Sequence, residues 1–115
     1  MVEGRVLGDG VMALFDTART AIACAFKCHE AASHYALDLH VGIHAGDVIE
    51  EDNDVHGGAE NLAARICSAS APGEVLVSDT VRGLARTSAS VTFEDRGESM
   101  LKGVADPVRL YAVQA

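Results

Sequence analysis

Hydrophobic periodicity switches along this chain between the period of a strand and that of a helix. Apolar side chains occupy every second position from residue 37 to residue 43, which is typical of a strand. From residue 59 to about residue 69 the apolar spacing is helical, with Leu62 and Ile66 on one face. The two periods together predict a domain of mixed strands and helices.

Turn and capping residues divide the rest of the chain into elements. The segment EGRVLGDGVMALF predicts two short strands around a Gly-Asp-Gly turn at residues 8–10. Asp16 and Thr17 predict the start of a helix that runs to about Ser33, and Ser78 predicts the N-cap of a short helix. The segment EEDNDVHGG is predicted to be a polar turn, APGEVLVS a buried strand, and VTFEDRGESMLKGVADPVRLYAV two strands joined by a loop.

This order of elements predicts an α+β sandwich with its helices on one side of the sheet. The first predicted hairpin carries apolar residues on both faces of its second strand, which predicts that both faces are covered. A chain of 115 residues with 49% apolar residues is long enough for one domain with a packed core.

The charge balance restricts the partners. Nine basic residues against 17 acidic ones give a net charge of −8, which argues against nucleic acid as a partner, because a phosphate backbone requires a basic face. A small phosphate ligand needs only a few local cations or a metal. No apolar run approaches the roughly 20 residues of a membrane span, and three cysteines without a signal peptide indicate a reducing, cytoplasmic setting.

Two pairs of residues could be metal ligands or ordinary structural residues. Cys24 and Cys28 lie one helical turn apart, and a metal there would need two more ligands, so packing cysteines are favoured. His40 and His44 share one face of the predicted strand. They could ligate a metal, but partly exposed strand residues are favoured.

The segment DVHGGAENLAARI carries a third pattern. A loop with two glycines runs directly into a helix, and Asn61 and Arg65 then lie one helical turn apart on the same face. By spacing alone, these are a surface amide and a solvated guanidinium. Several neighbouring segments favour another interpretation.

The segments LHVGIHAGDVIEEDNDVHGGAENLAARICSASAPGEVLVSDTVRGL and FEDRGESMLKGVADPVRLYAV, with GDGVMALF before them, closely resemble the class III adenylate/guanylate cyclase catalytic domain. The resemblance implies a ferredoxin-like α+β sandwich and head-to-tail pairing of two domains, with active sites in the groove between them. The implied reaction converts a nucleoside triphosphate to the 3′,5′-cyclic monophosphate and pyrophosphate with two divalent metals, Mg²⁺ or Mn²⁺.

The resemblance also implies roles for individual residues. Asp9, in the Gly-Asp-Gly turn, matches a metal-binding aspartate, where the alternative is an ordinary turn residue. Asn61 and Arg65 match the pair that orients the ribose and stabilises the transition state, so they are the expected catalytic residues.

Three further residues match substrate-binding positions. Asp54 matches the position that reads the purine and favours ATP over GTP, although it also belongs to an acidic turn. Lys102 matches the lysine that holds the triphosphate. Arg5 occupies a position where adenylate cyclases commonly carry a base-reading lysine, and this departure weakens the inference on base selectivity.

The family domain normally begins earlier, with a strand that carries the first metal aspartate in a Phe-x-Asp segment and with two helices after it. Residues 1–115 are therefore expected to be a partial, N-terminally truncated cyclase domain lacking the family's first strand and first helices. The expected enzyme is an adenylate cyclase that works as a homodimer or pairs with another cyclase chain, with exchange of an element as one route. The alternative is a catalytically inactive cyclase-like module that binds nucleotide weakly or pairs with another cyclase chain.

Overall fold

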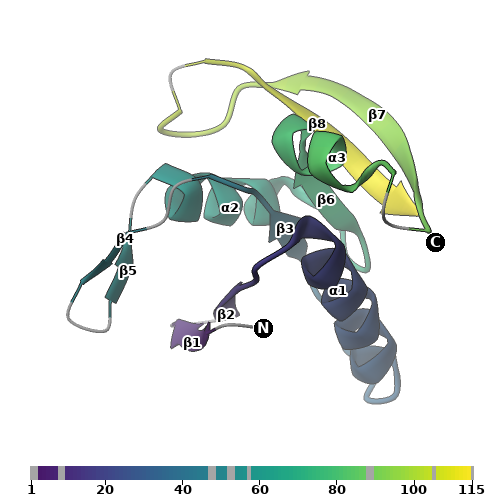
Figure 1. Ribbon diagram of the computed structural model, residues 1–115. Helices are drawn as coiled ribbons and strands as arrows, with labels where there is room; N and C mark the ends of the chain where they lie inside the picture. Colours follow the sequence, from purple (N-terminus) through teal and green to yellow (C-terminus); the bar gives the residue numbers. More distant parts are fainter. Residues whose placement is uncertain are drawn as a thin grey trace.

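The computed structural model describes residues 3–7, 10–46, 49–51, 54–56, 58–87, 90–104 and 106–114 (Figure 1). Its elements follow the order β1-β2-α1-β3-β4-β5-α2-β6-α3-β7-β8. The helices are α1 (Ala18–Ser33), α2 (Gly58–Ala69) and α3 (Asp79–Ala85). The strands are β1 (Glu3–Leu7), β2 (Gly10–Leu14), β3 (Val41–Ile43), β4 (Ile49–Glu51), β5 (Asp54–His56), β6 (Val75–Ser78), β7 (Thr92–Ser99) and β8 (Val108–Gln114).

The central sheet is mixed and has the strand order β3-β6-β8-β7. Strand β3 runs parallel to β6, whereas β6 with β8 and β7 with β8 are antiparallel pairs. Two hairpins, β1–β2 and β4–β5, form separate two-stranded sheets. The predicted α+β class is therefore confirmed. Across the described ranges, no helix is long and apolar enough to span a bilayer.

Strand β6 lies at the centre of the core, because its four residues are all buried. Val75 and Val77 belong to a cluster with Ile22 of α1 and Val81 of α3. Leu76, between them, belongs to a second cluster with residues of α2 and β8. Since neighbouring side chains of a strand point to opposite faces, α1 and α3 cover one face of the sheet and α2 covers the other. The expectation of helices on one side only is therefore wrong.

Side-chain caps begin two of the helices where the sequence predicts. The hydroxyl of Thr17 accepts a hydrogen bond from the Thr20 backbone N–H at 3.1 Å, and α1 begins at the next residue. The hydroxyl of Ser78 accepts one from the Val81 N–H at 3.5 Å at the start of α3. Each cap satisfies a backbone donor that has no partner within its helix.

The predictions for two segments are wrong. The alternating segment that begins at residue 37 forms a strand only from Val41 to Ile43. Before it, Ala36 has a φ of 55°, and the side chain of Leu37 is 59% exposed. Such a turn breaks an extended backbone. The predicted polar turn instead contains the hairpin β4–β5, in which Glu51 pairs with Asp54.

The hairpin β1–β2 forms around the predicted turn, with Val6 opposite Val11. These two side chains are 81% and 74% exposed, so the expectation that β2 is covered on both faces is wrong. Figure 1 shows this hairpin in purple, outside the four-stranded sheet and joined to the start of α1 by a short connection. A two-stranded hairpin by itself is only marginally stable in water.

A close backbone approach joins β3 to α2. A Cβ atom added at Gly42 would lie 2.2 Å from the backbone nitrogen of Cys67 and 2.6 Å from its Cα. Both distances are far below any normal contact, and both partner atoms belong to the helix backbone. Glycine at this position lets α2 lie directly against the strand.

We expect Gly42→Ala to lower the free energy of unfolding by about 1–3 kcal/mol, because an added methyl group forces the helix away from the strand. Denaturant unfolding measures the change. Gly83→Ala in α3 is the matched control, since nothing lies within 4 Å of its added Cβ. The control should be unchanged, or more stable by up to about 1 kcal/mol through helix propensity. Equal stability of Gly42→Ala and the parent would contradict the close contact.

Candidate functional site

Helix α2 presents Asn61 and Arg65 to solvent. Ile66 is fully buried and Leu62 packs beside it, so one face of the helix is fixed against the core. Asn61 and Arg65, four residues apart, are both exposed. The structure therefore places the predicted pair on one accessible side of a firmly packed helix, as their spacing predicts.

The loop between β7 and β8 is anchored to α2 by an apolar contact. Leu101 is 9% exposed and belongs to the same cluster as Ile66, with Val104 packed against that cluster. Lys102 follows directly and is exposed, and Gly103 turns the chain with a φ of 78°. Lys102 thus stands on a short turn whose apolar neighbours share a cluster with the helix that carries the predicted pair. Leu101 is a positioning residue that the sequence analysis did not single out, although an apolar residue directly before Lys-Gly is a usable signal.

Some cations of the chain are neutralised by carboxylates. Arg96 contacts Glu74 at 2.7 Å, and Arg109 contacts Asp95 at 2.8 Å. The Gly97 backbone N–H and the Arg109 guanidinium hold the pKa of the Asp95 carboxyl below its usual range. These pairs fasten the edge of the sheet formed by β7.

Arg65 and Lys102 differ from those arginines. Within the part of the chain that the structure describes, neither has a carboxylate partner or a side-chain hydrogen bond. A chain with an excess of acidic residues therefore leaves two cations near α2 available for an anion.

The other predicted site residues are placed less completely. Asp54 lies on β5, which contacts α2, so the backbone of the expected base-reading position is next to the helix of Asn61 (Figure 1). The position of its side chain lies outside the described part. Arg5 lies on β1 opposite Met12, in the separate hairpin sheet, and its side chain is also outside the described part. Asp9 lies outside the described residues altogether.

One chain therefore gathers the elements that carry Asn61, Arg65, Lys102 and Asp54 around α2. It holds Arg5 in a sheet that does not include them. Among the residues whose placement is described, no group of three or more histidines, cysteines, aspartates or glutamates could hold a metal ion. Asp9 is not one of these residues.

The two histidines of the predicted strand have separate, local partners. The Nδ1 atom of His40 lies 2.8 Å from the Ser70 carbonyl oxygen. The Nδ1 atom of His44 lies 2.7 Å from the Ser78 hydroxyl oxygen, and burial lowers the pKa of His44. Ser78 is 2% exposed and caps α3, so its contact with His44 is structural and does not make a nucleophile.

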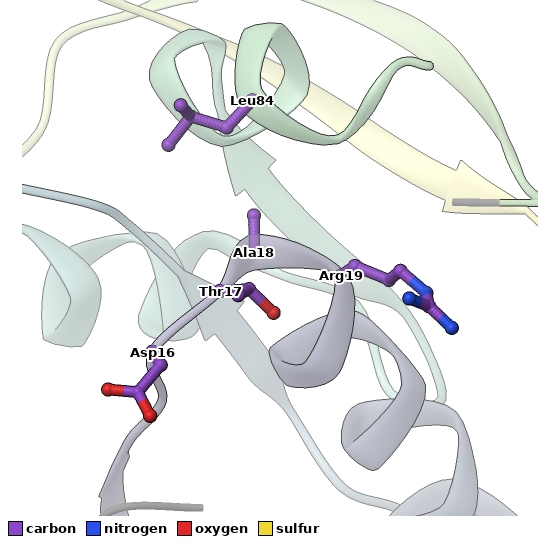
Figure 2. Close-up of a pocket in the computed structure, with 5 residues that line it drawn as sticks. All are labelled: Asp16, Thr17, Ala18, Arg19 and Leu84. Carbon is purple, nitrogen blue, oxygen red and sulfur yellow. The ribbon is translucent and has the colours of Figure 1, made fainter. Parts of the chain in front are cut away.

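A hollow of about 310 Å³ lies between the start of α1 and α3 (Figure 2). Ala18 and Leu84 point toward each other across it, while the charged ends of Asp16 and Arg19 point away in opposite directions. None of the predicted site residues lines this hollow.

Comparison with known proteins agrees with this fold. The family described as the adenylate and guanylate cyclase catalytic domain matches residues 5–115. The structure of an adenylate/guanylate cyclase/hydrolase from Silicibacter pomeroyi superposes with a TM-score of 0.85 at 32% identity, over 97% of this chain and 73% of that one. The adenylyl cyclase CyaB from P. aeruginosa gives 0.55 at 30% identity, over 64% of this chain and 41% of that one.

A curated relative, the putative adenylate cyclase 3 of Rhizobium meliloti (strain 1021), is 32% identical over 120 residues. That match covers 95% of this chain but only 20% of the relative. The α+β fold is thus of the nucleotide cyclase type. The chain belongs to the adenylate and guanylate cyclase catalytic domain family, as the sequence motifs predict.

The burial of His44 predicts a pH-dependent stability. Because the pKa of His44 is lowered in the folded state, the unfolded chain binds the proton more readily below about pH 6.5. Stability contributed by neutral His44 is therefore present above about pH 6.5 and is lost as the pH falls below it. The measurement is the free energy of unfolding from about pH 8 to about pH 5.

His44→Gln should flatten this dependence. His34→Gln, at an exposed histidine just after α1, is the control and should retain the parent profile. A profile for His44→Gln that follows the parent through this range would contradict the role of His44.

Proposed function

We propose that this chain is the catalytic domain of a nucleotidyl cyclase that converts ATP to 3′,5′-cyclic AMP and pyrophosphate. The main observation in support is the exposed pair of Asn61 and Arg65 on α2. The guanidinium of Arg65 has no carboxylate partner among the described residues. An arginine fixed on a rigid helix and not neutralised by a carboxylate suits the stabilisation of charge that develops in a transition state.

Each of three side chains has a separate role in this proposal. Arg65 stabilises the negative charge that grows on the α-phosphate as the ribose 3′-oxygen attacks. Asn61 hydrogen-bonds the ribose and aligns that oxygen, which lowers the entropic cost of ring closure. Lys102 holds the triphosphate from a turn that Leu101 anchors against α2.

A carboxylate for a divalent metal is assigned to Asp9. The family resemblance implies Mg²⁺ or Mn²⁺, and a hard cation of this kind requires oxygen ligands. When bound, such a metal would acidify the ribose 3′-hydroxyl and screen the triphosphate. No dedicated general base among the side chains is then required.

Asp54 is proposed to select adenine. Its carboxylate can accept a hydrogen bond from the 6-amino group of adenine, whereas the 6-oxo group of guanine presents a second acceptor. The placement of β5 against α2 supports this assignment, because it brings the base-reading segment to the helix that binds the ribose. Arg5 offers a forked donor in place of the family's lysine, so it contacts the base in a different geometry.

The active assembly is proposed to contain two chains arranged head to tail. Within the described part of one chain, β1 and β2 pair only with each other, and β3 has only β6 as a neighbour. Both β2 and β3 therefore offer an edge to another strand. A second copy or another cyclase chain can supply that strand, by simple pairing or by exchange of an element, and can bring its own Asp9 toward Arg65.

The separation of the hairpin sheet from α2 also favours a second candidate function. A chain whose hairpin β1–β2 forms a sheet of its own, apart from the sheet on which the proposed catalytic helix packs, could serve as a cyclase-like module that binds nucleotide weakly and pairs with a complete cyclase chain. In that case it would make no cyclic AMP alone but would change the activity of its partner.

The assay that tests catalysis supplies ATP or GTP with Mn²⁺ and measures the cyclic product. We expect cyclic AMP in excess over cyclic GMP, from this chain or from the chain with any coding sequence that precedes Met1. Arg65→Ala should lower kcat by at least about 100-fold, the usual cost of removing a group that stabilises transition-state charge.

Arg86→Ala is the matched control, because Arg86 is an exposed arginine at the end of α3, away from the proposed site. It should retain the parent rate. Arg65 is exposed, so its replacement should leave the unfolding midpoint unchanged. If no form of the protein produces cyclic nucleotide, the enzyme proposal is wrong and the non-catalytic module replaces it.

Mixing two inactive variants tests the head-to-tail arrangement. If Asp9 and Arg65 of different chains form one site, Asp9→Ala and Arg65→Ala are each inactive alone but complement each other. An equal mixture should recover roughly a quarter of the parent rate, because half of random dimers are mixed and each holds one intact site. A mixture that stays inactive, although the variants are shown to form mixed dimers, would place both residues in the same chain's site.

A further inference from the structure

Two thiols on α1 lie close together outside both core clusters. The Sγ atoms of Cys24 and Cys28 are 4.0 Å apart. Cys28 is exposed and Cys24 is half-buried, and neither belongs to the apolar core. The packing interpretation favoured by the sequence therefore does not account for Cys28.

Helix geometry prevents this pair from closing into a disulfide. Residues four apart in a helix have Cβ atoms about 5–6 Å apart, whereas a disulfide requires about 3.5–4.5 Å. Helix α1 runs without interruption from Ala18 to Ser33, with Thr17 as its cap, so the chain around the pair is held in helical geometry. A direct sulfur–sulfur bond would require this helix to distort.

A single bridging ion fits the same geometry without distortion. Metal–thiolate bonds of about 2.3 Å allow two sulfurs to lie up to about 4.6 Å apart. The observed 4.0 Å lies within that span. We propose that Cys24 and Cys28 form a two-thiolate site for a soft, thiophilic ion of low coordination number, of the Cu⁺ class.

The donor set selects against other ions. Thiolates prefer soft ions such as Cu⁺, while Mg²⁺ and Ca²⁺ require oxygen ligands. A structural zinc site requires four ligands, and the described residues supply no third histidine, cysteine or carboxylate to complete a cluster here. An ion that accepts two thiolates is therefore the one that matches the pair.

Binding exchanges protons for the ion. Burial raises the pKa of the Cys28 thiol, and its hydrogen bond with Cys24 raises it further. One Cu⁺ and two thiols give a dithiolate complex and release two protons, with no change of oxidation state. The site therefore requires no oxidant or reductant for the binding step itself.

Competition with the chromogenic Cu⁺ chelator bicinchoninate, under anaerobic reducing conditions, tests the site. The parent chain should withdraw one equivalent of Cu⁺ from the chelator. Cys24→Ser and Cys28→Ser should each lose this transfer, because a single thiolate cannot form the two-coordinate complex. Circular dichroism of both variants should show the parent helix content.

Cys67→Ser is the matched control. Cys67 lies on α2, across the sheet from α1, and its Sγ donates to the His40 carbonyl oxygen at 3.2 Å, a bond that serine can also form. This variant should withdraw Cu⁺ as the parent does. Transfer that persists in folded Cys24→Ser or Cys28→Ser, or transfer that disappears in Cys67→Ser, overturns the proposal. The outcome is independent of cyclase activity, because the readout is ion transfer.

Discussion

The contact between the backbone of β3 and the backbone of α2 is the constraint on which the site depends. Gly42 carries no side chain at the point where the two elements meet, so the helix lies directly on the strand. Ile66, fully buried on the same helix, then fixes the rotation of α2 about its axis. With distance and rotation both set, Asn61 and Arg65 have only the solvent side left to occupy. The position of the proposed catalytic pair is therefore a consequence of how the inner face of α2 is packed.

The charges around that position make it suitable for binding an anion. The chain has 17 acidic residues and nine basic ones, so carboxylates that could neutralise a cation outnumber the cations. Arg96 and Arg109 do find such partners, and they serve to fasten β7. Arg65 and Lys102 remain without one in the described ranges, although they belong to elements that share an apolar cluster. An anion bound between them would thus be attracted locally, while the acidic remainder of the surface disfavours extended polyanions.

The parts of this fold that the sequence predicts are the local ones. Thr17 and Ser78 cap helices where their hydroxyls indicate, and the spacing of Asn61 and Arg65 is enough to place them on one helix face. The errors concern contacts between distant segments. Leu37 continues the alternating pattern but precedes the strand, because pairing with β6 begins only at Val41. The packing of Leu101 on α2, and the division of the helices between the two sheet faces, likewise depend on partners far away in sequence.

Because the hairpin β1–β2 is separate from the central sheet, the stability of the chain and the completeness of its site depend on the same association. This hairpin exposes Val6 and Val11, and a two-stranded sheet gains too little from its own contacts to be stable alone. The β3 edge of the central sheet has, in the described part, no strand beside it except β6. Strand addition at these edges would satisfy backbone hydrogen bonds and would cover the hairpin. It would also set the turn that contains Asp9 in a fixed relation to Arg65. On this argument, the chain acquires its full stability and its complete site through the same association, so both should rise together with protein concentration.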